Sequence, residues 1–271
     1  MSIKAKLPPI IERHELKYTI PYSFVEPITQ FLEIYCDLDH YSSISEDNFY
    51  QVNSLYFDTR GLEFLKQRLF GKNGRFKVRV RCYGNGDKAP YFLEIKRKRG
   101  FSGMKFRATA REDEWPSILT NPGYRVSPQD SERERHNKEL FSRISCSYAI
   151  EPKLLTQYQR RAFISSIEEY ARVTMDTKMR YREQEHYSLV PNSDMKNYDN
   201  ETIYSNSYEN DASVILELKC NIGHVPKWML DLISVFNLKQ QGFSKYANSS
   251  IVSYFDDGIS YSRMDRVLKI Y

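Results

Sequence analysis

Residues 77–83 read KVRVRCY, a stretch in which a cation stands at every second position, at Lys77, Arg79 and Arg81. In an extended chain, residues two apart point the same way and lie about 6.6 Å from each other. The stretch therefore predicts a strand with one apolar and one cationic face. Such a face is either exposed to water or binds an anion, and one strand alone does not decide between the two.

The same alternation recurs along the chain. Strand patterns are predicted in RHELKYTI (13–20), VNSLYFDT (52–59), YFLEIKRK (91–98), GFSGMKFRA (100–108), KLLTQYQRRAFISS (153–166), ARVTMDTKMR (171–180) and VILELKC (214–220). Cations dominate the charged faces, which carry Arg13, Glu15, Lys17, Lys77, Arg79, Arg81, Glu94, Lys96, Lys98, Lys105, Arg107, Arg172, Glu217 and Lys219.

Helical spacing of apolar residues separates these strands. Helices are expected after Ser23 as N-cap, over residues 60–71 with Gly71 ending the helix, within residues 112–150 and over 228–236. Residues 243–250, FSKYANSS, are interpreted as a compact basic loop. Residues 183–211 are rich in Asn, Ser, Tyr and acids, and predict a long mobile loop or hairpin tip inserted in one domain spanning residues 1–271.

These patterns together predict an α+β fold built on a closed antiparallel barrel of about eight strands. Helices would cover its apolar outside, and the charged faces would line the lumen. Cations grouped away from water are costly unless counter-charges satisfy them, so a linear polyanion is the expected occupant. The few acids among the cations could hold magnesium or manganese against phosphate oxygens.

Composition excludes several classes of protein. The net charge of the 271-residue chain is only +5, so attraction of an anion must come from local clustering. No apolar run reaches the length of a signal sequence or a membrane span, and the four cysteines form no CxxC pair, which together predict a cytoplasmic protein with reduced thiols. The loop GxxxxGK[ST], the GxGxxG turn and the HExxH helix are all missing from the sequence.

The strand motifs also resemble a known family. RHELKY, SLYFDT, KVRVRCYG, YFLEIKRK, QYQRRAF, RVTMD, VILELK and FSKY, in this order over residues 13–246, resemble the VTC domain, the catalytic domain of the vacuolar transporter chaperone polyphosphate polymerase. That family lies within the triphosphate tunnel metalloenzymes. The resemblance implies a tunnel barrel that makes inorganic polyphosphate from ATP with manganese or magnesium, and a membrane-protein partner that accepts the product.

Site residues follow from the same resemblance, together with the charged faces. The expected catalytic residues are Arg79, Arg81, Arg172 and Lys245. The expected phosphate-binding residues are Lys17, Lys96, Lys105, Tyr158, Arg160, Lys219 and Ser244, and the expected metal ligands are Glu217 and Glu15. The superfamily often begins with ExExK, whereas this chain has Arg13 at the first acidic position, which favours a polymerase over a hydrolase.

Three functions stay open at this stage. The chain is a polyphosphate polymerase, a tunnel that binds or senses polyphosphate without turnover, or a tunnel triphosphatase. A nucleic-acid binder is a more distant fourth, because the cations lie on alternating strand faces and form no single exposed platform, so no nucleic acid is expected. Glu217 and Glu94 could also be plain ion pairs with Lys219 and Lys96 on the same strand faces.

Overall fold

A computed structural model describes residues 13–85, 90–99, 102–168, 170–198 and 212–255. Eight strands, each antiparallel to its neighbours, follow one another in a single curved sheet. In sheet order they are β1 (Arg13–Pro21), β10 (Ala212–Asn221), β8 (Ala171–Glu183), β7 (Glu151–Ser165), β3 (Tyr50–Asp58), β4 (Arg75–Tyr83), β5 (Tyr91–Arg99) and β6 (Ser102–Ala110). Two short strands, β2 (Cys36–Leu38) and β9 (Lys196–Asn197), pair with β7 and β8.

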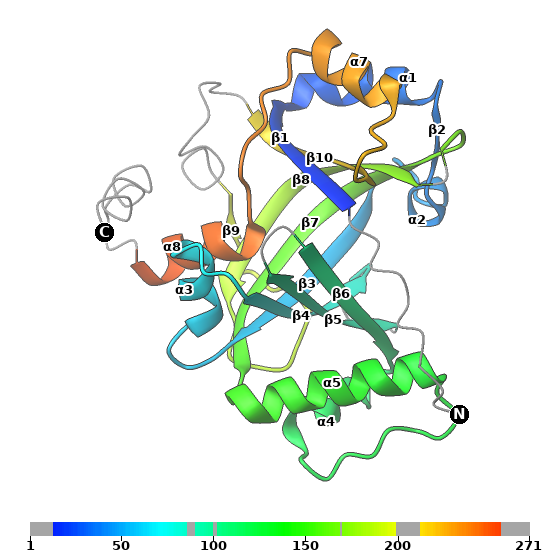
Figure 1. The fold of residues 1–271 in the computed structure, drawn as a ribbon. Coiled ribbons are helices and arrows are strands. Elements are labelled where there is room, and N and C mark those ends of the chain that lie inside the picture. Colours follow the sequence, from blue (N-terminus) through cyan, green and yellow to red (C-terminus); the bar gives the residue numbers. More distant parts are fainter. Residues whose placement is uncertain (1–12, 86–89, 100–101, 169, 199–211, 256–271) are drawn as a thin grey trace.

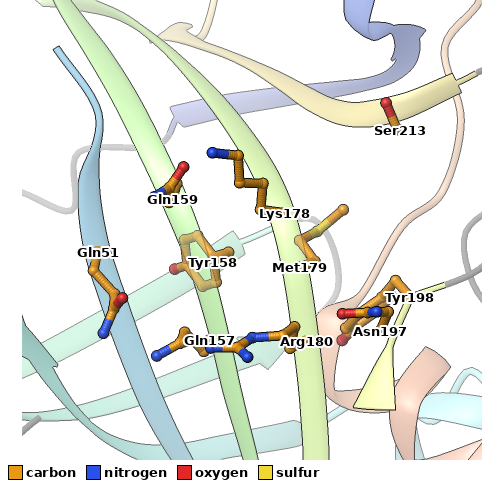
Figure 2. Close-up of a pocket in the computed structure, with 10 residues that line it drawn as sticks. All are labelled: Gln51, Gln157, Tyr158, Gln159, Lys178, Met179, Arg180, Asn197, Tyr198 and Ser213. Carbon is orange, nitrogen blue, oxygen red and sulfur yellow. Dashed lines mark hydrogen bonds between the residues drawn. The ribbon is translucent and has the colours of Figure 1, made fainter. Parts of the chain in front are cut away.

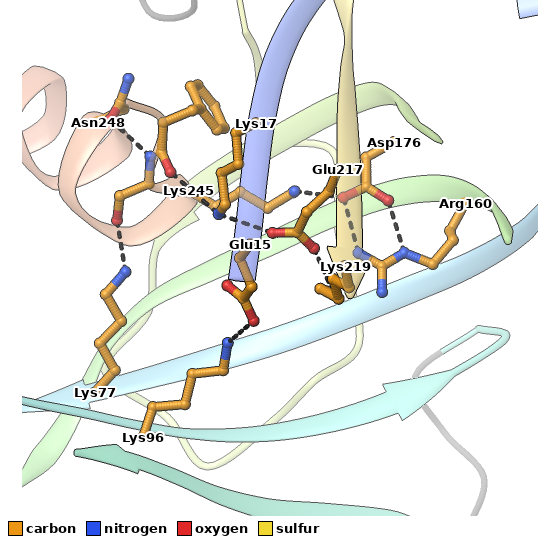
Figure 3. Close-up of polar contacts among 12 residues, drawn as sticks. Glu15, Lys17, Lys77, Lys96, Arg160, Asp176, Glu217, Lys219, Lys245 and Asn248 are labelled. Atoms are coloured by element: carbon orange, nitrogen blue, oxygen red, sulfur yellow. Dashed lines mark hydrogen bonds and ion pairs between the residues drawn. The ribbon is translucent and has the colours of Figure 1, made fainter. Parts of the chain in front are cut away.

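The predicted closure of the barrel is wrong. Within the described part of the chain, β1 and β6 form the two edges of the sheet and share no backbone pairing, so the barrel is open. Side chains bridge the interior instead, because Lys96 on β5 and Glu15 on β1 form an ion pair of 3.0 Å (Figure 3). The sheet therefore curls into a half-barrel, and its inward side is called the concave face below.

Strand alternation places apolar side chains on the convex face of the sheet, where helices cover them. Helices α1 (Val25–Leu32) and α7 (Lys227–Val235) pack over β1, β10 and β8 (Figure 1). Helices α4 (Trp115–Thr120) and α5 (Glu132–Tyr148) cover β4, β5 and β6 at the opposite end of the molecule. The alternating residues of KVRVRCY follow this division, since Val78 and Val80 are fully buried in that second core.

Two local predictions about helices need correction. Ser23 is not an N-cap, because a short 3-10 turn η1 (Tyr22–Phe24) precedes α1, whose N-cap position is Phe24. The stretch interpreted as a basic loop is mostly helical, since α8 spans Lys245–Phe255. Helix α3 (Glu63–Leu69) ends as expected, with Gly71 in the left-handed region at φ 63°.

Short elements connect the sheet to its surroundings. Helix α2 (His40–Ser43) is anchored to β7, because the Ser42 hydroxyl accepts a hydrogen bond of 2.9 Å from the amide of Ala162. The predicted polar insert begins at the end of β8 and returns as β9, and its residues 199–211 lie outside the described chain.

Candidate phosphate-binding site

The concave face gathers a cluster of charged side chains, called here the charged cluster. Its carboxylates are Glu15, Glu94, Asp176 and Glu217, and its cations are Lys17, Lys77, Arg79, Arg81, Lys96, Lys105, Arg107, Arg160, Lys219 and Lys245. Figure 3 shows several of these residues pointing toward one another from β1, β4, β5, β7, β8, β10 and α8. Cations outnumber carboxylates, so the cluster carries a net positive charge that an added anion would offset.

Glu217 on β10 is held between two lysines. Lys17, directly across in the β1–β10 register, lies 2.9 Å from its carboxylate, and Lys219 contacts the other oxygen. Burial alone would raise the pKa of Glu217, but Lys17 and Lys219 hold it well below its ordinary value. The carboxylate is therefore ionised throughout the physiological pH range.

Asp176 on β8 forms a second centre. Arg160, its register neighbour on β7, donates two hydrogen bonds of 2.7 and 2.8 Å, and Lys245 at the start of α8 lies 2.5 Å away. Burial alone would raise the pKa of Asp176, and the two cations lower it below its ordinary value instead. Asp176 is 1% exposed, so one buried carboxylate on β8 links that strand to β7 and α8.

Glu94 on β5 is the third buried carboxylate. The Nη2 atom of Arg79 lies 2.6 Å away, Lys105 lies 2.5 Å away and Arg107 contributes a longer contact of 3.9 Å. Glu94 is 1% exposed, which leaves little room for a metal ion to displace these partners. Its role is to hold cations of β4 and β6 in fixed positions.

Lys77 differs from these pairs because it donates a hydrogen bond of 2.8 Å to the neutral hydroxyl of Ser244 (Figure 3). Burial and the neighbouring Lys17 and Lys96 lower its pKa well below the ordinary value. An anion placed beside Lys77 would reverse that shift. The ammonium group therefore marks a position where a phosphate would be stabilised.

Neutral donors complete the cluster. The Tyr158 hydroxyl accepts a hydrogen bond of 3.2 Å from Arg81, and the ammonium of Lys245 lies 4.4 Å above the centre of the Tyr158 ring. Arg81 also contacts Ser54 at 3.4 Å. Protonated hydroxyls carry no formal charge, so these two contacts do not neutralise the guanidinium of Arg81, and the carboxylate that acts on it electrostatically is Glu94.

A family-model comparison identifies this architecture. The model described as the VTC domain matches residues 12–254. The chain belongs to the VTC domain family. A search of curated proteins finds no match.

Three solved structures are similar to this VTC domain, and the first of them has the same fold. A candidate adenylate cyclase from Bacillus halodurans is 13% identical and aligns over 90% of this chain and 100% of its own length, with a TM-score of 0.50. A candidate adenylyl cyclase from Hippeastrum, described with a dominant triphosphatase activity, is 13% identical over 89% of this chain and 97% of its own, with a TM-score of 0.44. The PH1819 protein of Pyrococcus horikoshii is 9% identical over 88% and 98%, with a TM-score of 0.43.

The VTC domain places most of the predicted site residues together. Arg79, Arg81, Lys17, Lys96, Lys105, Tyr158, Arg160, Lys219, Ser244, Lys245, Glu15 and Glu217 all contribute to the concave face. Arg172 stands apart, because it is exposed at the start of β8 with its guanidinium 5.8 Å from the centre of the Tyr170 ring. Asp176 was missed as a site residue, although the polar face of RVTMD contains it.

Few carboxylates of this domain are available to bind a metal ion. Among the residues that the structure describes, no three His, Cys, Asp or Glu side chains form a metal-binding group. Glu15 and Glu217 nevertheless interact electrostatically, and each raises the cost of ionising its neighbour. Magnesium commonly takes one or two carboxylates, with phosphates and water completing its shell. Here Lys17 and Lys219 contact Glu217, and Lys96 contacts Glu15, so an ion bound by this pair would have to displace lysines.

A separate cavity of about 450 Å³ lies beside the bulge that interrupts the pairing of β7 and β8 (Figure 2). Gln157, Gln159, Lys178 and Arg180 line it together with Tyr158, which is the one lining residue that also belongs to the predicted phosphate site. Lys178 adopts a left-handed φ of 48° at this bulge. The cavity therefore adjoins the charged cluster but consists mainly of amides and long side chains.

None of the helices in the described ranges is both long and apolar enough to cross a membrane.

Proposed function

We propose that this VTC domain is a polyphosphate polymerase that transfers the terminal phosphoryl group of ATP to a growing polyphosphate chain on its concave face. The observation that carries the proposal is the excess of cations in the charged cluster, and above all Lys77, which donates a hydrogen bond to a neutral hydroxyl. A chain of phosphates would supply the missing negative charge. Membership of the VTC domain family supports the same chemistry.

Phosphoryl transfer depends on placement and charge neutralisation more than on proton transfer, because its transition state is loose and highly charged. Arg79 and Arg81 come from strand β4 and Lys245 comes from helix α8, so they can neutralise oxygens from different sides. The accepting phosphate end has a second pKa of about 6 and is already largely ionised at neutral pH. The reaction therefore needs no general base, and Arg172 would act at the edge of the face.

A divalent cation would neutralise phosphate oxygens when it is bound, with manganese and magnesium as the expected ions. Glu217 would hold it, helped by Glu15. Both carboxylates are ionised in the pocket of cations, since Lys96 and Lys17 oppose the effect of burial on their pKa values. Triphosphate tunnel enzymes as a class use such ions, and this chain offers them two neighbouring carboxylates.

Hydrolysis of triphosphate is the second candidate function. The solved relative from Hippeastrum described with triphosphatase activity motivates this alternative. The charged cluster favours transfer, because the ion pairs of Glu94, Asp176 and Glu217 lower all three pKa values and make these carboxylates poor bases for an attacking water. A domain that binds polyphosphate without turnover is the third candidate.

Product analysis separates the candidates. Purified domain is incubated with ATP and manganese, or with tripolyphosphate and manganese, and the products are resolved by gel electrophoresis and phosphate assay. Long-chain polyphosphate from ATP supports the polymerase. Orthophosphate from tripolyphosphate supports the phosphatase, and tight binding without product supports the binding module.

Two variants test the residues involved. Arg81→Ala is expected to abolish synthesis. Arg81 is 6% exposed and contacts Tyr158, so removing its guanidinium would leave a neutral gap in the phosphate path. Arg143→Ala is the matched control, since that arginine is exposed on α5 and pairs weakly with Glu139 at 3.9 Å. Equal activity in both variants would overturn the assignment. The same proposal includes a cytoplasmic location for the domain and transfer of its product to a membrane-protein partner.

A further inference from the structure

Aromatic rings form a rim at one end of the concave face. The rim consists of Tyr41 on α2, Tyr50 on β3, Tyr83 on β4 and Phe92 on β5. The Tyr41 and Tyr83 ring centres lie 4.4 Å apart, Tyr50 lies 5.4 Å from both, and Phe92 lies 5.3 Å from Tyr83. Tyr50 and Phe92 are buried, whereas Tyr41 and Tyr83 remain partly exposed.

The rim lies two residues along the strands beyond the charged cluster. Tyr83 follows Arg81 by two residues on β4, and Phe92 precedes Glu94 by two residues on β5. Tyr50 is directly opposite Arg160 in the register of β3 and β7. Two residues of a strand span about 6.6 Å, which is close to the length of a ribose between its phosphate and its base.

Arg107 connects the rim to the cluster. Its guanidinium lies 3.7 Å from the centre of the Phe92 ring, and the side chain is 39% exposed. Its contact with Glu94 is long, at 3.9 Å. A guanidinium stacked on a ring presents a second flat face, which aromatic bases bind by stacking and cation–π attraction.

The other end of the concave face is occupied by α8. Tyr246 stacks on Tyr56, with ring centres 5.1 Å apart and planes 22° apart, and packs with Leu154 and Tyr181. Figure 1 shows α8 beside α3 on that side of the sheet. Because α8 and its rings fill that end, the base of a nucleotide whose phosphates lie in the charged cluster would lie toward the aromatic end.

We propose that Tyr41, Tyr83 and the Phe92–Arg107 stack form a base-binding platform that distinguishes a nucleoside triphosphate donor from inorganic polyphosphate. This inference rests on the proposed use of ATP. A polyphosphate chain has no flat apolar face, so the rim adds nothing to its binding. The platform gives the donor an affinity that the product chain lacks and leaves the charged cluster to bind both.

Paired ligands test the platform. Affinities of ATP and tripolyphosphate are measured by calorimetry at fixed manganese for the wild type, for Tyr41→Leu and Tyr83→Leu, and for Tyr41→Phe and Tyr83→Phe. The Leu variants are expected to lose about tenfold in affinity for ATP and less than twofold for tripolyphosphate, because one stacking partner disappears. The Phe variants keep the ring and should bind ATP like the wild type. Tyr148→Leu, at a 41% exposed ring of α5, is the control.

A second measurement needs no variant. An ATP analogue with a photoreactive azide on the base is crosslinked to the wild-type protein, and the labelled peptide is found by mass spectrometry. Labelling of Tyr41 or Tyr83, suppressed by excess ATP, supports the platform. Labelling elsewhere, or equal losses for both ligands in the Leu variants, overturns it while the polymerase proposal stands. If the wild type binds neither ligand, the proposed function itself fails.

Discussion

The phenol of Tyr246 on α8 donates a hydrogen bond of 2.6 Å to the buried carboxylate of Asp58 at the end of β3. The same carboxylate accepts from the amides of Phe64 and Leu65 in the first turn of α3, each at 2.9 Å. One side chain therefore fastens two helices to the sheet. Because Tyr246 follows Lys245 directly, this bond also fixes the helix turn that enters the charged cluster.

Loss of that bond should weaken phosphate binding from a distance. Tyr246→Phe keeps the ring stack on Tyr56 but removes the donor to Asp58, and we expect a loss of about 1.5 kcal/mol in stability. We also expect roughly fivefold weaker tripolyphosphate binding, because Lys245 is less firmly placed. The measurement combines thermal unfolding with calorimetry.

A double-mutant cycle separates positioning from simple destabilisation. If Tyr246 acts through Lys245, Tyr246→Phe should have little further effect on affinity in a Lys245→Ala background. Tyr254→Phe on the same helix is the control, since its hydroxyl bonds the carbonyl of Lys153 at 2.6 Å, outside the charged cluster. Additive losses in the cycle would show that Tyr246 merely stabilises the fold.

Asp176→Asn should destabilise the free protein and increase its response to ligand. The change leaves Arg160 and Lys245 without a buried counter-charge, which costs about 3 kcal/mol and lowers the melting temperature by roughly 6 to 12 °C. Because the pKa of Asp176 is lowered, the stabilisation by its ionised form is complete above about pH 4 and is lost as the pH falls further.

Tripolyphosphate supplies the negative charge that this variant lacks, so it should raise the melting temperature of Asp176→Asn more than that of the wild type. The control is Asp113→Asn, whose partner Arg111 and whose own side chain are both largely exposed. That variant should unfold at the same temperature as the wild type. An equal ligand response in all three proteins would contradict the role of Asp176 as an internal substitute for phosphate.

Binding should take up protons through Lys105. Burial lowers the pKa of Lys105 to about 7, against the opposing attraction of Glu94. The free amine is therefore mostly neutral at pH 8, and a bound phosphate raises its pKa again. Tripolyphosphate affinity should fall as the pH rises from 6 to 8.5, and calorimetry in buffers of different ionisation enthalpy should detect proton uptake at pH 8.

Lys105→Arg isolates this contribution, because arginine stays charged throughout that range. The ligand titrates identically with both proteins, so the ratio of their affinities reports the lysine alone. We expect the variant to bind about threefold to tenfold tighter than the wild type at pH 8.5 and about equally at pH 6. A ratio that does not change with pH would show that Lys105 remains charged.

The alternation of residues along the strands was enough to predict the charged face, but it did not predict which charged side chains on that face pair with each other. Lys77, Arg79 and Arg81 share one side of β4 because side chains alternate along any strand. Arg160 meets Asp176, however, through a register that shifts at a bulge between Gln157 and Gln159. A bulge changes which residues face each other, and alternation within either strand does not reveal it.

Closure and the start of α8 depended on features outside the local pattern. Whether β1 meets β6 is set by the tilt and stagger of all the strands together, so alternating residues could not show that the edges stay apart. The Ser244 hydroxyl accepts from the amide of Ala247, as an N-cap does. The Asn and Ser residues that follow Ala247 are typical of turns, so the sequence predicted a loop where this helix begins.

Glu217→Gln should change metal-dependent and metal-free binding in opposite directions. Without a divalent ion, removing a carboxylate from the phosphate path should tighten tripolyphosphate binding, since Lys17 and Lys219 lose their internal partner and become available to the ligand. With manganese, the gain in affinity over the metal-free state should shrink by about tenfold, because the chief metal ligand is lost.

The comparison is made by calorimetry in chelator and in manganese, with Asp176→Asn as the second carboxylate variant. Asp176 is enclosed by Arg160 and Lys245, so its loss should leave the gain from manganese unchanged. If Glu217→Gln retains the full gain from manganese, Glu217 is an ion-pair partner of the lysines and the metal is held elsewhere. If both variants lose the gain from manganese equally, that gain depends on the total charge of the concave face, and neither carboxylate is a metal ligand.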